Sequence, residues 1–168
     1  MGRAVTLSAP RPLTAECVLD GFDCGEWTLN DWLRRRALAN GVSGASRTFV
    51  VCDGDRVVGF HALATGALAQ SAATGRFRRN MPDPIPVVVL ARLAVDRDYG
   101  GRGIGRALVR DASLRVAQVA EVVGIRGLVV HALNSRAREF YLDLGFDASP
   151  IDDSILMIAV ADLAANLA

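Results

Sequence analysis

The chain has 168 residues, of which 51% are hydrophobic and 22% charged, and its formal net charge is +1. This composition is that of a globular rather than a disordered chain, and the length predicts one globular domain over residues 1–168 with an ordinary core. The near-neutral charge hides an uneven distribution, because all nineteen basic residues are arginine and several of them gather in two clusters.

The first elements that the pattern predicts are a short strand and an amphipathic helix. The strand covers residues 5–8 and ends at the prolines that follow it. The helix begins after Thr28, a possible N-cap, and stops at Asn40-Gly41. Its apolar residues recur at helical spacing: Leu29, Trp32, Leu33 and Ala37. The first arginine cluster falls largely on the polar side of this helix and consists of Arg34, Arg35 and Arg36.

A hairpin and a long loop are expected next. Two strands, 47–52 and 56–63, flank an Asp-Gly-Asp turn, which is a compact hairpin signal. Residues 64–86 are rich in turn residues and predict a loop. This loop carries the second arginine cluster, which consists of Arg76, Arg78 and Arg79. The uncharged stretch 57–75 also contains polar residues and three glycines, so we expect a strand and a loop there rather than a membrane span.

The most informative segment is the glycine-rich turn near the middle of the chain. Residues 87–95 are typical of a strand covered on both faces, and residues 103–123 carry an apolar stripe at helical spacing. Between them, the glycines and arginines of residues 100–106 offer backbone N–H groups and positive charge at a helix N-terminus. The segment predicts a pyrophosphate-binding turn, with an ordinary tight strand–helix turn as the alternative.

This turn does not fit the two best-known nucleotide-binding loops. A dinucleotide-binding unit places its glycines near the start of the domain, whereas these lie at mid-chain. A phosphate loop of the nucleotide-hydrolase type needs a lysine, and the chain has none.

The last third predicts a strand over 127–132, a helix over 135–144 that stops at Gly145, and a final strand over 155–160. The order of strands and helices after the glycine turn therefore indicates a mixed α/β domain. The three cysteines have no metal-ligand spacing, and no secretory signal is visible. We therefore expect reduced, mostly buried thiols, a cytoplasmic protein, and neither a metal nor a membrane partner.

Two segments together resemble the GNAT N-acetyltransferase superfamily. Residues 93–105 resemble its acetyl-CoA loop, and residues 132–146 resemble its second hallmark, an Asn followed by a Phe-Tyr pair and Gly-Phe. The resemblance implies the GNAT fold, a central mixed sheet with splayed strands flanked by helices. It also implies acetyl-CoA as co-substrate and a single catalytic residue, Tyr141, as the general acid that protonates the leaving thiolate. The residues that it assigns to acetyl-CoA are Leu93, Ala94, Val95, Gly101, Arg102, Gly103, Ile104, Gly105, Arg106 and Asn134.

A narrower resemblance covers most of the chain. Residues 22–24, 29–40, 47–51, 58–60, 90–95 and 129–133 are similar to the acetyltransferase toxins of bacterial toxin–antitoxin modules, the TacT and AtaT type. That family acetylates the amine of aminoacyl-tRNA and blocks translation, is usually dimeric, and is neutralised by a ribbon-helix-helix antitoxin. The residues that would then meet tRNA are the two arginine clusters, Arg34, Arg35, Arg36, Arg76, Arg78 and Arg79, together with Arg92. One departure is Gly100, where the family loop usually begins with Gln or Arg.

Several residues keep a structural alternative. Tyr141 can simply pack its helix on the core, with Phe140 as the inward anchor, and Asn134 can be an N-cap. His61 and His131 are possible bases, but each lies in an apolar strand, which favours a structural histidine. Arg92 interrupts an apolar strand and either pairs with an acid or faces the substrate cleft.

Two other functions remain open. The chain can be a GNAT enzyme that acetylates a small amine or a protein N-terminus. It can also be a non-catalytic module that binds acetyl-CoA or serves in an operator-binding complex. If no base is present, an α-amine suits direct attack because its pKa is about 8, against about 10.4 for lysine.

Overall fold

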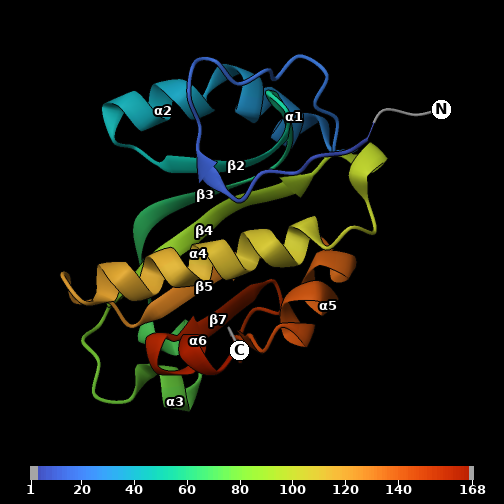
Figure 1. The fold of residues 1–168 in the computed structure, drawn as a ribbon. Coiled ribbons are helices and arrows are strands. Elements are labelled where there is room, and N and C mark those ends of the chain that lie inside the picture. Colours follow the sequence, from blue (N-terminus) through green and yellow to red (C-terminus); the bar gives the residue numbers. More distant parts are fainter. Residues whose placement is uncertain (1–3, 167–168) are drawn as a thin grey trace. The chain divides into compact units, whose positions relative to one another are not determined.

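Strands and helices are interspersed along the chain in the computed structural model, which describes residues 4–166 (Figure 1). The strands are β1 (Arg11–Pro12), β2 (Arg47–Asp53), β3 (Arg56–Leu68), β4 (Ile85–Val95), β5 (Gly127–His131), β6 (Asp147–Ala148) and β7 (Ile155–Ala159). The helices are α1 (Trp27–Arg35), α2 (Ala37–Ser43), α3 (Gly75–Arg78), α4 (Ile104–Ala120), α5 (Ser135–Asp143) and α6 (Val160–Asn166), with short 3-10 turns at Gln70–Ala72 and Arg97–Tyr99. Over the described residues the strand order is β1-β2-β3-β4-β5-β7-β6. The sheet is mixed, since β4 and β5 run parallel and β5 and β7 antiparallel, so the predicted mixed α/β class is confirmed.

The chain forms two compact units. The first takes the described residues up to 63 together with 92–111, and the second takes 64–91 together with the described residues from 112 onward. Three elements run from one unit into the other: β3, β4 and α4.

In the first unit, the alternation of side chains along the strands separates two apolar clusters. One cluster packs α1 and α2 against the sheet through Phe22, Trp32, Leu33 and Phe60, and it includes Ala94 of β4. The other packs the first turns of α4 through Val51, Val58, Tyr99, Ile104 and Leu108, with Leu93 and Val95 of β4 against it. Neighbouring residues of β4 thus belong to different clusters, as the two-residue period of a strand requires.

In the second unit, β5 lies parallel to β4 and antiparallel to β7, which also pairs with β6. The core of this unit includes Phe77 of α3, Ile85 and Val87 of β4, and Met157 of β7. Gly127 permits the close approach of β5 and β7, because a Cβ there would lie 2.1 Å from the carbonyl oxygen of Ile158.

The structure corrects the predicted helix over 29–40, which is two helices. Arg36 lies between α1 and α2 with φ −117° and ψ −32°, so the helical path breaks there. The residue before α1 is Glu26, which makes no side-chain cap, and α2 runs past Asn40-Gly41 to Gly44 at φ +83°. Thr28 is therefore inside α1 rather than its N-cap.

The ends of other elements also differ from the prediction. The segment 5–8 contributes only an isolated bridge from Leu7 to Asp53, and the first strand is β1. The expected loop over 64–86 is shorter, because β3 continues to Leu68 and β4 already begins at Ile85. The sequence pattern missed β6 and α6 altogether. No helix within residues 4–166 is long and apolar enough to cross a membrane.

Candidate functional site

The strand that leads into the glycine turn ends in the first unit. Ala94 is buried in the cluster below α1, whereas Leu93 and Val95 are half-buried and pack toward the cluster that holds α4. Their side chains are thus part of the core, as hydrophobic periodicity predicts. A ligand along residues 93–95 would therefore be contacted by main-chain groups.

The glycine turn has the backbone geometry that an anion site needs. Gly101 has φ +75° and Gly103 has φ +77°, values that L-residues rarely adopt. Nothing lies within 4 Å of an ideal Cβ at either position, so open space faces both glycines. α4 begins at Ile104, and the N–H groups of its first turn have no intrahelical acceptor. Arg102 and Arg106 are exposed beside them, whereas Ile104 is buried and Gly105 half-buried.

The start of α4 lies very close to β3. A Cβ on Gly59 would lie 2.8 Å from Cγ2 of Ile104 and 3.3 Å from Cδ1 of Leu108. A glycine at this position therefore lets the N-terminus of α4 pack directly on the strand.

A network of side chains stabilises the 3-10 turn Arg97–Tyr99, which precedes the glycine turn. The sequence pattern did not predict this network. The Asp96 carboxylate is 1% exposed and accepts from the backbone N–H of Asp23 (3.2 Å), the backbone N–H of Asp98 (2.9 Å) and Nη2 of Arg56 (3.2 Å). The Tyr99 hydroxyl donates to Oδ2 of Asp53 at 2.7 Å. These bonds fix both ends of the 3-10 turn that precedes the glycines. The signal that could have revealed the network is the acid and the tyrosine adjoining a glycine- and arginine-rich loop.

Two arginines border the Tyr99 ring. The guanidinium carbon of Arg56 lies 5.2 Å from the ring centroid, and that of Arg102 lies 5.7 Å from it. Arg102 is thereby held at the turn by a cation–π contact, which leaves its N–H donors available.

Arg92 is held by an aromatic ring rather than by a carboxylate. Its guanidinium carbon lies 4.4 Å from the centroid of Trp32, which in turn stacks on Phe60 with centroids 6.0 Å apart. Partial burial lowers the pKa of Arg92 by desolvation. These contacts give Arg92 an aromatic partner and not the acidic partner that was the alternative. A guanidinium that stacks on a ring still has N–H donors at its edges.

The second unit places Asn134 and Tyr141 at the two ends of α5. The Asn134 side chain accepts from the backbone N–H of Ala137 at 2.9 Å, so it caps the helix as its local sequence allowed. Tyr141 is 5% exposed, and its ring makes edge contacts with Phe140 and Phe146 at centroid distances of 5.1 Å and 5.4 Å. The expectation that Phe140 would be the inward anchor is wrong, because Tyr141 is buried and Phe140 only half-buried. Desolvation raises the pKa of the Tyr141 phenol well above its usual value.

The first arginine cluster, in the first unit, does not form a uniform patch. Nη1 of Arg34 donates to the carbonyl of Phe22 at 2.8 Å, and Nε of Arg35 pairs with Asp31 at 2.9 Å. Arg36 is exposed at the break between α1 and α2. Only part of this cluster therefore keeps its full donor capacity.

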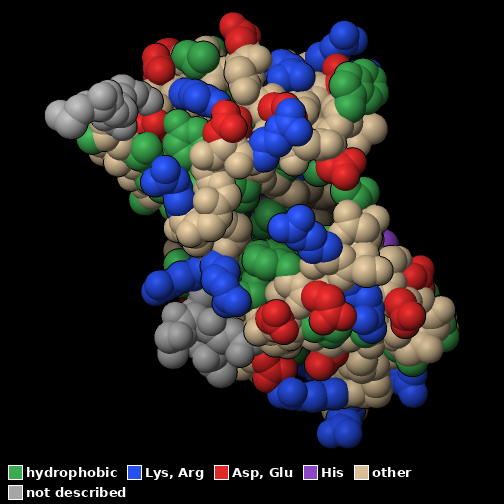
Figure 2. Space-filling model, turned by 90° about the vertical axis from the view of Figure 1, so that its right-hand side faces the viewer, with side chains coloured by type: hydrophobic (Ala, Val, Ile, Leu, Met, Phe, Trp, Pro, Cys, Tyr) green, Lys and Arg blue, Asp and Glu red, His purple; other side chains and the backbone are tan. Residues whose placement is uncertain are grey.

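The second arginine cluster belongs to the second unit. Arg76 forms an ion pair with Asp162, Arg78 donates to the carbonyl of Ala73 at 3.4 Å, and Arg79 is exposed. Figure 2 shows basic side chains standing beside acidic ones on the face in view rather than merging into one basic surface. On this face, acidic and basic side chains are thus intermixed.

The two histidines differ from each other. His61 is fully buried, its Nε2 lies 2.8 Å from Oδ2 of Asp111, and its ring stacks on Phe49 at 5.1 Å. This agrees with the preference for a structural histidine at this position. His131 is exposed, so the same expectation is wrong for it.

The cysteines are free thiols, of which Cys52 is buried and Cys17 and Cys24 are half-buried. Burial raises the pKa values of the Cys24 and Cys52 thiols. Among residues 4–166, no group of three or more His, Cys, Asp and Glu side chains could hold a metal ion.

Comparisons with known proteins agree on one family. The family model described as "Acetyltransferase (GNAT) domain" matches residues 44–148. A protein of Mycobacterium tuberculosis named "tRNA-acetylating toxin" is 52% identical over 155 residues, which cover 92% of this chain and 93% of that protein.

Solved structures of AtaT have a similar fold over nearly the whole chain. AtaT complexed with acetyl-methionyl-tRNAfMet has a TM-score of 0.88 at 30% identity, covering 97% of this chain and 100% of that one. A tyrosine-to-phenylalanine mutant of AtaT, bound to the C-terminus of the antitoxin AtaR and acetyl-CoA, has a TM-score of 0.81 at 31% identity. It covers 95% of this chain and 97% of that one.

Proposed function

The chain belongs to the GNAT acetyltransferase family, and we propose that it is a toxin that acetylates the α-amine of aminoacyl-tRNA with acetyl-CoA, thereby blocking translation. The observation that carries the proposal is the similarity, over nearly the whole chain, to a protein named for tRNA acetylation. The proposal treats residues 1–168 as one acetyltransferase domain. Acetyl-CoA is the acetyl donor, as in the AtaT relative that binds it.

The glycine turn fits the pyrophosphate of acetyl-CoA. Gly101 and Gly103 have positive φ and open space where a Cβ would stand, so a phosphate oxygen can approach the main chain. The N-terminus of α4 adds a partial positive charge, and Arg102 and Arg106 add full ones. In the proposal, Leu93, Ala94 and Val95 bond the pantetheine arm and the acetyl carbonyl through their main chain, and Asn134 contacts the arm. Because the side-chain oxygen of Asn134 already caps α5, the contact with the pantetheine arm would use its amide NH2 or its main chain.

Tyr141 is proposed as the general acid. As the amine nitrogen bonds to the acetyl carbon, the carbon–sulfur bond breaks, and the leaving sulfur needs a proton. The buried phenol keeps its proton at every physiological pH because its pKa is raised. The same burial makes a lasting phenolate costly. We therefore expect the proton given to sulfur to be replaced by the proton leaving the substrate nitrogen, so that amide and thiol form with no net charge on Tyr141.

The proposal requires no side chain as general base. An α-amine with a pKa of about 8 is roughly one-quarter neutral at pH 7.5, so deprotonation by solvent supplies the nucleophile. His61 is already bonded to Asp111 in the core, which does not favour a role in this step.

The exposed arginines are proposed to meet tRNA. All six cluster members are exposed, and the four with described side-chain partners are Arg34, Arg35, Arg76 and Arg78. Arg36 and Arg79 are therefore best suited to contact phosphate oxygens. Arg34, Arg35, Arg76 and Arg78 can still contribute with the donors that their present partners leave. Arg92 lies one residue before the strand end proposed to hold the acetyl group, so it is suited to the end of the tRNA.

The proposed partners follow those of the toxin family. We expect a ribbon-helix-helix antitoxin, a homodimer and action in the cytoplasm, where charged tRNA is found. The support is the AtaT relative bound to the C-terminus of its antitoxin, together with the free thiols, which suit a reducing compartment.

The substitution Tyr141→Phe tests the chemistry. It removes only the hydroxyl, so the fold and the affinity for acetyl-CoA should persist while CoA release and growth arrest are lost. Isothermal titration with CoA and a growth assay of the induced gene measure the two effects. Undiminished growth arrest with Tyr141→Phe would rule out Tyr141 as the acid.

A further inference from the structure

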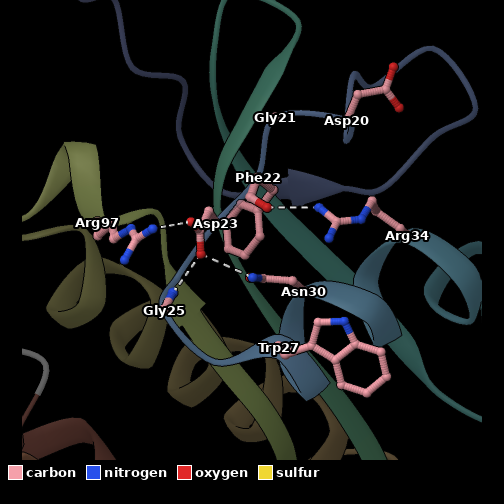
Figure 3. A pocket seen from close by; sticks show the side chains of 9 residues that line it. All are labelled: Asp20, Gly21, Phe22, Asp23, Gly25, Trp27, Asn30, Arg34 and Arg97. Carbon is pink, nitrogen blue, oxygen red and sulfur yellow. Dashed lines mark hydrogen bonds and ion pairs between the residues drawn. The ribbon is translucent and has the colours of Figure 1, made fainter.

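A pocket in the first unit is not explained by the acetyl-CoA site. Its volume is about 440 Å³, and it lies between the segment that precedes α1, the outer side of α1, and the turn after β4 (Figure 3). This volume is within the range of about 300–1,000 Å³ that is usual for small-ligand sites. The side chains that matter for its chemistry are Asp20, Asp23, Trp27, Asn30, Arg34 and Arg97.

One wall of the pocket is rigid. The Asp23 carboxylate accepts from the backbone N–H of Gly25 (2.9 Å) and from Nδ2 of Asn30 (3.1 Å), and it pairs with Nη2 of Arg97 (2.5 Å). Oδ1 of Asn30 in turn accepts from the backbone N–H of Cys24 at 2.9 Å. The carboxylate of Asp23 is therefore occupied, and its role is to shape the wall.

The remaining groups are free to meet a ligand. Trp27 is 70% exposed, an unusual state for the largest apolar side chain. Arg34 uses Nη1 to bond the carbonyl of Phe22 and keeps its other donors. Figure 3 shows the Arg34 guanidinium on the side of the pocket next to the Trp27 indole, with the exposed Asp20 side chain at the rim and its carboxylate turned outward. The pocket thus offers a flat aromatic surface with a guanidinium donor beside it and a carboxylate acceptor at its rim.

Charge narrows the class of ligand. Two carboxylates and two guanidinium groups line the pocket, so it has no formal excess of either sign. A free phosphate or a metal ion would meet opposing charges, whereas a neutral planar group would not. An indole that stacks, beside a donor and an acceptor, suits a nucleobase.

We infer that this pocket binds a nucleobase that presents an amino group beside an acceptor nitrogen, as adenine and cytosine do on their Watson–Crick edges. The base would stack on Trp27, and its ring nitrogen would accept from Arg34. The exposed Asp20 side chain would turn inward by a change of rotamer and accept from the amino group. A uracil, which presents a carbonyl in place of the amino group, would bring an acceptor against the Asp20 carboxylate.

Two sources of such a base come within reach. Arg97 is two residues beyond Val95, so its Cα lies at most about 8 Å from the end of the strand proposed to hold the acetyl donor. One source is the single-stranded CCA end of tRNA, and the other is the adenosine of CoA. The first source rests on the proposed function, whereas the second rests only on the family.

The test is a binding measurement that needs no catalysis. The chain has two tryptophans, and Trp32 is buried, so quenching by a ligand reports mainly on Trp27. The full chain with Tyr141→Phe is titrated with the RNA trinucleotides CCA and UUU and with CoA. We expect CCA to quench the fluorescence and to bind at least about fivefold more tightly than UUU.

Variants in the same background locate the site. Trp27→Ala should weaken CCA binding by about tenfold, and Trp27→Phe should retain most of the affinity. Because Trp27→Ala removes the fluorescent reporter, both affinities are measured by displacement of a labelled oligonucleotide. Asp20→Asn should reduce the preference for CCA over UUU. Val42→Ala, at an 87% exposed apolar residue of α2 outside the pocket, is the matched control and should change nothing.

The outcomes separate the sources and the proposals. If CoA competes with CCA and Trp27→Ala weakens both, the pocket serves the cofactor; if only CCA is weakened, it serves tRNA. Equal binding of CCA and UUU, or unchanged affinity in Trp27→Ala, overturns the inference, and so does the absence of quenching by both CCA and CoA. Intact acetylation of charged tRNA alongside such a result would leave the proposed function standing.

Discussion

Burial of Tyr141 ties the proposed chemistry to the stability of the protein. The ring lies against Phe140 and Phe146, and the phenol is 5% exposed with a raised pKa. A phenol with a raised pKa favours folding as long as it keeps its proton. Above the unfolded pKa of about 10, the unfolded chain loses a proton that the folded chain retains, so stability falls as pH rises.

We therefore predict that Tyr141→Phe flattens the alkaline loss of stability. The wild type should lose up to about 1.4 kcal/mol of unfolding free energy per pH unit above about pH 10 through this residue, and the variant should lack that contribution. Urea unfolding at pH 9 and pH 11 measures the difference, while the cysteines and arginines contribute equally to both proteins. Parallel curves for the two proteins would mean that the Tyr141 phenol is not held neutral by burial.

Arg92 offers a second prediction at the residue scale. Its stacking on Trp32 gains about 0.5–1 kcal/mol, but its partial desolvation opposes this gain. Arg92→Met keeps the apolar stem and removes the charge, so the melting temperature should change little. The KM for charged tRNA should rise at least about fivefold while that for acetyl-CoA stays constant, because the charge would act on tRNA alone. A parallel rise in both KM values would place Arg92 in the cofactor site instead.

At the scale of elements, the glycine turn joins β4 to α4 through two residues of positive φ. Gly101 and Gly103 have this conformation, whereas Gly100 has φ −64° and ψ 156°, which any residue adopts. The backbone conformation at Gly100 therefore does not require a glycine, and the Gln or Arg that is usual in the family loop would fit there. A Cβ at Gly100 would lie 3.7 Å from the carbonyl oxygen of Arg97, an ordinary contact.

Gly103→Ala should consequently destabilise the fold by about 1–2 kcal/mol and raise the KM for acetyl-CoA, because alanine is strained at positive φ. Gly100→Ala is the matched control and should leave both quantities nearly unchanged. Gly100→Gln, which restores the usual family residue, should fit the turn and lower the KM for acetyl-CoA. Thermal unfolding and steady-state kinetics check all three, and equal losses for Gly100→Ala and Gly103→Ala would contradict the account of the turn.

The elements that sequence predicted best are those with a long, strong pattern. The buried β4 and β5 and the helices α4 and α5 were found within a few residues of their ends, since their apolar periodicity is unbroken. The break at Arg36 was not predictable, because Leu33 and Ala37 keep helical spacing across it. β1 and β6 have two residues each and carry no period at all.

The same reasoning explains what could be predicted of the site. The glycine turn is a local pattern and was found, but Asp96, Tyr99 and Trp32 act through partners far away in the sequence. Tyr99 bonds Asp53, and Trp32 holds Arg92, so only the folded chain brings these pairs together. Tertiary packing also decides which residue of the Phe140-Tyr141 pair is buried. The sequence predicted Phe140, and this prediction was wrong because Tyr141 is the buried residue.

On the scale of the whole molecule, a net charge of +1 means that binding to a polyanion must depend on a few local arginines. Two cluster members already have acidic partners, Arg35 with Asp31 and Arg76 with Asp162. The salt dependence should therefore come mainly from Arg36 and Arg79.

We predict that kcat/KM for charged tRNA falls with salt as a power law. Arg36→Ala and Arg79→Ala should each reduce the log–log slope by about 0.7–0.9 if each removes one phosphate contact, whereas Arg35→Ala should change it less. Arg35→Ala, which removes a side chain already paired with Asp31, serves as the matched control. A slope that none of these variants alters would place the tRNA contacts elsewhere on the chain.

The central claim is that acetyl moves from acetyl-CoA to the α-amine of an aminoacyl-tRNA. The most direct measurement incubates the chain with acetyl-CoA and total charged tRNA, digests the tRNA, and identifies the aminoacyl-adenosine ends by mass spectrometry. The account predicts one added acetyl group on the amino acid of at least one tRNA with the wild type, and none with Tyr141→Phe. Unmodified aminoacyl ends throughout would contradict it: CoA release with a small amine or a protein N-terminus would then identify a different acetyltransferase, and no release with any acceptor would identify a binding module.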